Sequence, residues 1–91
     1  MSIRVEFYGI PRHRTGVATT TVEIAGATAL LIDVVRRLSD RFPSLARDCF
    51  DQDGLRDGFA ANVNGERFVS DASTPLVDGS CLLILSADAG G

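Results

Sequence analysis

The sequence contains no lysine, although it has nine arginines among its 91 residues. A chain without lysine has no side-chain amine that could accept an amide link from another copy of itself. Copies of this protein therefore cannot be joined through a side-chain amide, and the α-amino group is the remaining amine. A GC-rich genome is the simplest source of the arginine bias, so the absence of lysine by itself assigns no function.

Cysteine is also scarce, with only Cys49 and Cys81 in the chain. They lie far apart in the sequence, and their spacing is not that of metal ligands. Two cysteines exclude an iron–sulfur cluster of the ferredoxin kind, which needs four thiolate ligands. Cys81 stands inside an apolar run, so we interpret it as a small core or strand residue. This cysteine usage is typical of a reducing compartment.

Long hydrophobic runs and an excess of basic charge are both missing. No apolar stretch approaches the length needed to span a membrane, and residues 1–5 enter an alternating pattern directly instead of forming an export signal. The net charge of −3 argues against nucleic-acid binding, which usually requires a basic surface. We therefore expect a cytoplasmic protein with neither a membrane nor a nucleic-acid partner.

Groups that could carry out catalysis are few. The single histidine, His13, lies between two arginines in a polar segment that we predict to be a solvated turn. The segment Asp51–Gly54 faintly resembles a calcium loop, but the first and last ligand positions would then be Cys49 and Ala60, which cannot serve. We therefore expect no metal site, no catalytic residue and no enzymatic activity of its own.

What the sequence does contain is a clear pattern of strands around one helix. Residues 3–8 alternate apolar and polar side chains, as a half-buried strand does, and Gly9–Gly16 breaks that strand before a second one at residues 17–24. Apolar residues at three- and four-residue spacing predict an amphipathic helix over residues 29–42, with Thr28 as its cap. Pro43 ends it.

The second half of the chain is predicted to be mainly strand. Residues 43–58 indicate a short helix followed by a loop. Residues 59–63 and 66–69 form a hairpin around Asn64-Gly65, a dipeptide that favours a tight turn. Leu76 is a candidate for burial, and the continuous apolar run at residues 81–85 is typical of a central strand.

The resulting order of elements, β-β-α-β-β-β, predicts an α+β protein with the β-grasp (ubiquitin-like) fold. We expect a mixed sheet of four to five strands, with one main helix packed on one face and the last strand beside the first. Residues 1–91 are expected to form a single domain, in which residues 86–91 are a flexible C-terminal tail ending in the diglycine Gly90-Gly91.

In this arrangement the sequence resembles the MoaD/ThiS family of sulfur-carrier proteins. That family includes the small subunit of molybdopterin synthase, the thiamine sulfur carrier and carriers for cysteine synthesis. The resemblance covers nearly the whole chain and is carried by several ordered segments: Val5–Tyr8, Arg12, Gly16, Val35–Phe42, Ala61–Gly65, Pro75–Gly79 and Ala89–Gly91.

The resemblance implies that Gly91 is the reacting residue. In this family an E1-like enzyme uses ATP and Mg²⁺ to adenylate the terminal carboxylate, and a persulfide sulfur donor then leads to a thiocarboxylate. The carrier delivers this sulfur to a synthase, either the large subunit of molybdopterin synthase or an enzyme of the cysteine or thiamine pathway. Gly90 and Gly91 lack a Cβ and can enter a narrow channel. The carrier itself binds no cofactor.

Alternation along the last strand predicts a surface for these partners. If Leu82 and Ile84 point into the helix-covered core, then Leu83 and Leu85 lie on the opposite face, where apolar side chains are expected to be covered. A partner enzyme or a neighbouring loop could cover them. The predicted partner contacts are Leu83, Leu85, Ser86, Ala87, Asp88 and Ala89.

The tail departs from the family pattern. Molybdopterin-type carriers have a proline-bearing stretch before the diglycine, where this chain has Ser86, Ala87 and the charged Asp88. The long stretch at residues 43–58 and the segment Ile84–Ala87 also resemble carriers that feed cysteine synthesis, so the receiving pathway stays open.

Two other functions compete with sulfur carriage. A ubiquitin-like modifier would use the same carboxylate of Gly91 to form amides with lysines of other proteins. A β-grasp interaction module would have an incidental diglycine.

Overall fold

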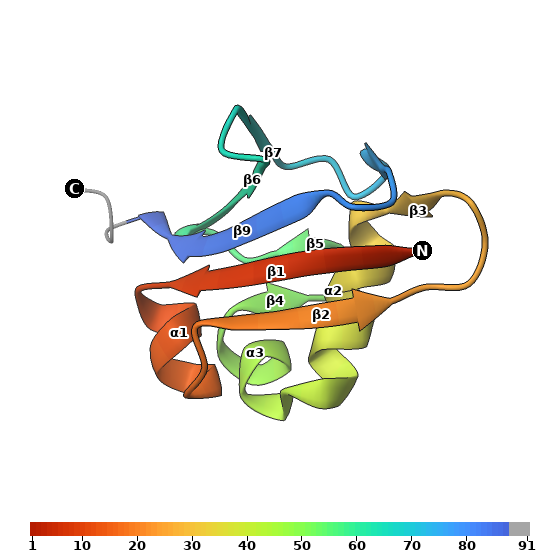
Figure 1. Cartoon of the computed structure of the whole chain (residues 1–91). Helices are drawn as coiled ribbons and strands as arrows, with labels where there is room; N and C mark the ends of the chain where they lie inside the picture. Colours follow the sequence, from red (N-terminus) through yellow and green to blue (C-terminus); the bar gives the residue numbers. More distant parts are fainter. Residues whose placement is uncertain (88–91) are drawn as a thin grey trace.

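The computed structural model describes residues 1–87, and a five-stranded sheet runs through it in the order β2-β1-β9-β6-β7 (Figure 1). Strand β9 is parallel to β1, whereas the other neighbouring pairs are antiparallel, so the sheet is mixed. The expectation that the last strand lies centrally beside the first is confirmed. The strands of this sheet are β1 (Ser2–Tyr8), β2 (Thr19–Glu23), β6 (Phe59–Val63), β7 (Arg67–Val69) and β9 (Cys81–Ser86).

The helices pack on one side of this sheet. They are α1 (Ile10–Thr15), α2 (Leu31–Arg41) and α3 (Pro43–Asp48). The main helix, α2, buries Leu31, Val34, Val35 and Leu38 against the inward side chains of the sheet. The predicted amphipathic helix is therefore confirmed, and no helix within residues 1–87 covers the opposite face of the sheet (Figure 1).

The start of α2 corrects the prediction that Thr28 caps it. Residues 29 and 30 are extended, because β3 (Ala29–Leu30) pairs with β8 (Pro75–Leu76). The helix consequently begins at Leu31, and the carboxylate of Asp33 accepts a hydrogen bond from the Leu30 amide at 2.8 Å. Leu76, paired with Ala29, is only 2% exposed, which confirms its predicted burial.

The connection between β1 and β2 is a helix, and the prediction of a polar turn there was wrong. Proline is tolerated in the first turn of a helix, where its missing amide has no partner to lose. Pro11 occupies that position in α1 and is buried. Gly16, with φ +76°, ends the helix in the left-handed conformation that glycine favours. His13 lies on this helix and is exposed.

Residues 43–58 extend the core instead of forming only a helix and a loop. The predicted short helix is α3, and it is followed by a small hairpin of β4 (Phe50–Asp51) and β5 (Gly54–Leu55). Leu45, Cys49 and Phe50 are buried by this segment. Within residues 1–87, no group of three His, Cys, Asp or Glu side chains is placed to hold a metal ion.

The hairpin between β6 and β7 turns at Asn64-Gly65, as predicted. Asn64 and Gly65 have φ of 59° and 73°, the positive values of the tight turn that this dipeptide favours. As for membranes, none of the helices in the described part of the chain has the length and apolar character needed to cross one.

Candidate functional site

The end of β9 is the structural base from which the predicted reactive tail begins. Ser86 is the last residue of the strand and is only 4% exposed, so it belongs to the sheet rather than to the predicted flexible tail. Ala87 follows it and is exposed. The predicted contacts Asp88 and Ala89 and the predicted reactive residues Gly90 and Gly91 lie outside the described residues.

Two hydrogen bonds from different parts of the chain fix this base. The Ile10 amide at the start of α1 donates to the Ser86 hydroxyl oxygen at 3.2 Å. The Ala87 amide donates to the carbonyl oxygen of Gly58 at 2.6 Å. Because both partners are held by other elements, the point at which the chain leaves the sheet is fixed.

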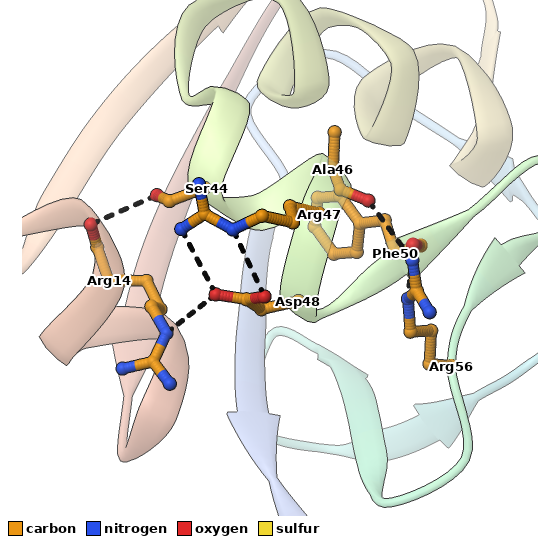
Figure 2. Close-up of polar contacts among 7 residues, drawn as sticks. All are labelled: Arg14, Ser44, Ala46, Arg47, Asp48, Phe50 and Arg56. Atoms are coloured by element: carbon orange, nitrogen blue, oxygen red, sulfur yellow. Dashed lines mark hydrogen bonds and ion pairs between the residues drawn. The ribbon is translucent and has the colours of Figure 1, made fainter.

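Helix α1 is held by polar contacts with α3 (Figure 2). Arg14 Nε lies 2.8 Å from a carboxylate oxygen of Asp48, and the Ser44 hydroxyl donates to the Arg14 carbonyl oxygen at 3.0 Å. Arg47 contacts the same carboxylate at 3.2 Å. Hydrogen bonds from Arg47 and Arg14 lower the pKa of Asp48 below its ordinary value of 3.8.

Arg56 holds the segment that leads to Gly58 in place through hydrogen bonds to backbone carbonyl oxygens. Its guanidinium donates to the carbonyl oxygens of Phe50 at 2.7 Å and Ala46 at 3.4 Å (Figure 2). Its own amide donates to the Cys49 carbonyl oxygen at 3.0 Å. Residues 43–58, to which the sequence assigns no role, therefore support both anchors of the tail base.

The alternation predicted for β9 is confirmed by burial. Leu82 and Ile84 are fully buried under the helices. Leu83 and Leu85 lie on the opposite face, which we call the open face, and are half-buried. That a partner covers them remains a prediction.

Strand register brings other apolar side chains to Leu83 and Leu85. Leu85 lies between Tyr8 of β1 and Ala60 of β6. Next to this row, Phe68 of β7 is 69% exposed. We call Tyr8, Ala60, Phe68, Leu83 and Leu85 the apolar patch.

Sequence reasoning did not assign Tyr8, Ala60 or Phe68 to the functional surface. The period-two rule that selected Leu83 and Leu85 would also have placed these three on the open face. Alternation within each strand shows which residues share a face. It does not show which residues of different strands lie next to each other until the strand order is known.

A polar cluster borders the apolar patch on the β1 side. Glu6 accepts hydrogen bonds from the Tyr8 hydroxyl at 2.5 Å and from the Cys81 thiol at 3.3 Å, and Arg4 lies 3.4 Å away. The hydrogen bond from Tyr8 is the largest cause that lowers the pKa of Glu6, and the same bond raises the pKa of Tyr8. The tyrosine ring is thus held on the open face.

Neither cysteine is a good nucleophile. Burial raises the pKa of the Cys81 thiol, and the neighbouring Glu6 carboxylate raises it further. Burial also raises the pKa of Cys49, which is fully covered by the core. Because the thiolate is the reactive form, a raised pKa lowers the fraction of each thiol that can react at neutral pH.

No family model and no curated protein matches the sequence. Solved structures do match, and over nearly the full length. The structure of SAMP1, a small archaeal modifier protein from Haloferax volcanii, has a TM-score of 0.83 and 24% identity, covering 100% of both chains.

Two further structures have the same architecture. A protein from Pyrococcus furiosus named as molybdopterin converting factor, subunit 1, has a TM-score of 0.76 and 21% identity, covering 94% of this chain and 97% of that one. The BexX/CysO complex from Amycolatopsis orientalis contains a chain with a TM-score of 0.72 and 25% identity, covering 98% of this chain and 99% of that one.

These likenesses confirm the predicted α+β class and β-grasp fold. The resemblance of this chain to the MoaD/ThiS family is therefore confirmed in its three-dimensional structure.

Proposed function

We propose that this chain is a sulfur carrier of the MoaD/ThiS type and not itself an enzyme. The carboxylate of Gly91 is adenylated by an E1-like enzyme and converted to a thiocarboxylate. The sulfur then serves the synthesis of molybdopterin, or of cysteine or thiamine. The observation that carries this proposal is the apolar patch on the open face, directly beside the fixed base of the tail.

The chemistry requires little from the carrier. A carboxylate is a poor electrophile until one oxygen becomes part of a good leaving group, and the activating enzyme supplies that group from ATP with Mg²⁺. A persulfide donor attacks the acyl adenylate and displaces AMP, and a thiol reductant then cleaves the resulting acyl disulfide, which leaves the thiocarboxylate on the carrier. The carrier has to present an unhindered carboxylate and a surface on which the enzyme can dock. Gly90 and Gly91 suit the first task, and the apolar patch suits the second.

Chain length links the two tasks. Residues 88–91 reach at most about 14 Å from Ala87 when fully extended. An enzyme whose active site receives Gly91 therefore has to bind close to the end of β9. Leu85, two residues before Ala87, lies at that end of the open face with Tyr8 and Ala60 as its neighbours. Docking on the apolar patch satisfies this requirement.

A ubiquitin-like modifier is the second candidate function. It is favoured by the likeness to SAMP1, whose name describes a modifier protein. In this case the activated Gly91 carboxylate would form an amide with lysines of other proteins. The two functions share the activation step and differ in the group that accepts the carboxyl carbon.

The activation step is the direct test. Purified chain is mixed with ATP, Mg²⁺ and the E1-like enzyme encoded by the same genome, and ATP–pyrophosphate exchange is measured. We expect exchange that depends on the chain and is abolished when Gly90 and Gly91 are deleted. Exchange that is absent with the folded full chain, or unaffected by the deletion, would contradict the proposal and favour a β-grasp interaction module.

A further inference from the structure

One buried polar atom on the open face has no hydrogen-bond partner. Asn62 lies on β6, in register between Leu83 of β9 and Phe68 of β7, and is only 8% exposed. Its side-chain oxygen, Oδ1, is fully covered and accepts no hydrogen bond from any described residue. Of the buried side-chain nitrogen and oxygen atoms within residues 1–87, Asn62 Oδ1 is the one left unpaired.

Such an atom needs a physical explanation. The large majority of buried polar groups in proteins are hydrogen-bonded, because an unpaired group loses its bonds to water and gains nothing in return. A leucine of similar size would fit the apolar surroundings of Leu83 and Phe68 without this cost. The asparagine is therefore a local destabilising feature placed in the middle of an apolar surface.

We propose that Asn62 Oδ1 accepts a hydrogen bond from the activating enzyme when that enzyme covers the apolar patch. This inference rests on the proposed function. The partner therefore needs a binding surface whose apolar side chains contact Leu83, Leu85 and Phe68. At the centre of that surface it needs one N–H or O–H group that donates to Asn62 Oδ1. The activating enzyme fits, since the short tail requires it to sit on this end of the face.

Phe68 is the register neighbour of Asn62 on β7 and a side chain that can move to admit a donor. Its ring is 69% exposed, so packing holds it only weakly. Rotation of this side chain away from Asn62 would open the oxygen to a partner. In the complex, the ring and Leu83 would then surround the new hydrogen bond and exclude water from it, which strengthens it.

The same atom discriminates between partners. A surface that matched the apolar patch but carried no donor would leave Oδ1 unpaired, as it is in the free chain. Such a surface gains no hydrogen bond from Asn62, so a partner with a donor at this position is favoured over unrelated apolar surfaces. Asn62 is thus a specificity-determining residue, and the surrounding side chains supply most of the contact area.

The test compares Asn62→Leu with the wild type in two measurements. Removing the unpaired oxygen should leave the isolated protein as stable as the wild type, or more stable, in thermal unfolding. In ATP–pyrophosphate exchange, the KM for the carrier should rise about tenfold while kcat stays unchanged, as expected for a lost hydrogen bond in docking. Thr21→Val is the matched control, because Thr21 lies on the same face in β2 but outside the apolar patch.

Two results would overturn the inference while leaving the proposed function intact. One is a lower unfolding temperature for Asn62→Leu, which would show that the amide has a partner within the chain. The other is a KM equal to that of the wild type, which would show that no donor meets Oδ1. If the wild-type chain itself supports no exchange, the proposed function fails, and the role of Asn62 in activation fails with it.

Discussion

The Ala87 amide donates a hydrogen bond to the carbonyl oxygen of Gly58 at 2.6 Å. This bond joins the last described residue to the segment positioned by Arg56, and a second bond joins Ser86 to α1. The tail therefore leaves the sheet at a point that two separate elements determine. A carrier that delivers its carboxylate into an enzyme channel benefits from such a fixed base, because less of the tail has to be ordered on binding.

The first prediction concerns the anchor formed by Ser86. In Ser86→Ala the Ile10 amide loses its acceptor in a partly buried position. The free energy of unfolding should fall by about 1 kcal/mol, and the melting temperature by about 4–8 °C. Hydrogen exchange of the Ile10 amide should become faster. The control is Ser70→Ala, because Ser70 is exposed, and it should change neither the free energy of unfolding nor the exchange rate. Equal effects in both variants would show that the Ser86 hydroxyl does not anchor α1.

The second prediction separates binding from stability on the apolar patch. Phe68 is 69% exposed, so Phe68→Ala should change the free energy of unfolding by no more than about 0.5 kcal/mol. The KM for the carrier in ATP–pyrophosphate exchange should nevertheless rise about tenfold, because aromatic residues at the centre of interfaces contribute strongly.

The matched control is Val77→Ala. Val77 is 65% exposed but lies outside the apolar patch. Its KM should equal that of the wild type. If Phe68→Ala behaves in the same way, the open face does not dock the activating enzyme.

The third prediction uses the pH dependence of stability. Hydrogen bonds from Arg47 and Arg14 lower the pKa of Asp48 below 3.8, so its ionised form is favoured in the folded state. The resulting stabilisation is present above the unfolded-state pKa and is lost as the pH falls through the folded-state pKa. Urea midpoints of the wild type and Asp48→Asn should therefore differ at pH 7 and converge below about pH 3.

Asp40→Asn is the control for this series, because Asp40 is exposed on α2 and outside the contacts of Figure 2. Its midpoint should follow that of the wild type throughout. A difference between wild type and Asp48→Asn that persists unchanged at low pH would show that the carboxylate does not fasten α1 to α3.

The fourth prediction concerns cysteine reactivity. Burial and the neighbouring Glu6 raise the pKa of Cys81 above 9.0, so little thiolate is present at neutral pH. Alkylation by iodoacetamide at pH 7.5 should be slower than that of an unfolded cysteine peptide and should accelerate as the pH is raised above 9. Cys49 should stay unmodified in the folded protein. Rapid alkylation of Cys81 at neutral pH would contradict this assignment.

The activating enzyme should also protect Cys81, which lies on the open face in the same strand as Leu83 and Leu85. Mass spectrometry of peptides after alkylation at high pH, with and without the enzyme, measures this protection. Equal modification in both samples would place the enzyme elsewhere.

Most of the main sheet and its helix could be predicted because each element carries its own periodic pattern. Alternation predicts β1 and β6, a continuous apolar run predicts β9, and three- and four-residue spacing predicts α2. Between Gly9 and Gly16 the glycine and proline residues predict a turn, but Pro11 is equally suited to the first turn of a helix, which is where it lies. Local propensity favours Thr28 as a cap, whereas pairing of β3 with β8 places the helix start at Leu31.

The candidate site was only partly predictable for a different reason. Leu83 and Leu85 follow from one strand alone, since alternation decides their face. Asn62 and Phe68 become part of the surface only through the register of β6 with β9 and β7, which are distant in sequence. The support given by Arg56 and Asp48 likewise depends on contacts between elements that no local pattern encodes.

The most direct test of sulfur carriage is the intact mass of the chain after incubation with the E1-like enzyme, ATP, Mg²⁺, a persulfide donor and a thiol reductant. We predict that the mass rises by the difference between one sulfur and one oxygen atom, and that fragmentation places the exchange at Gly91. Adducts with other proteins through lysine amides, with no exchange of oxygen for sulfur, would instead identify a modifier. A wild-type chain that stays folded and unchanged in mass would contradict both.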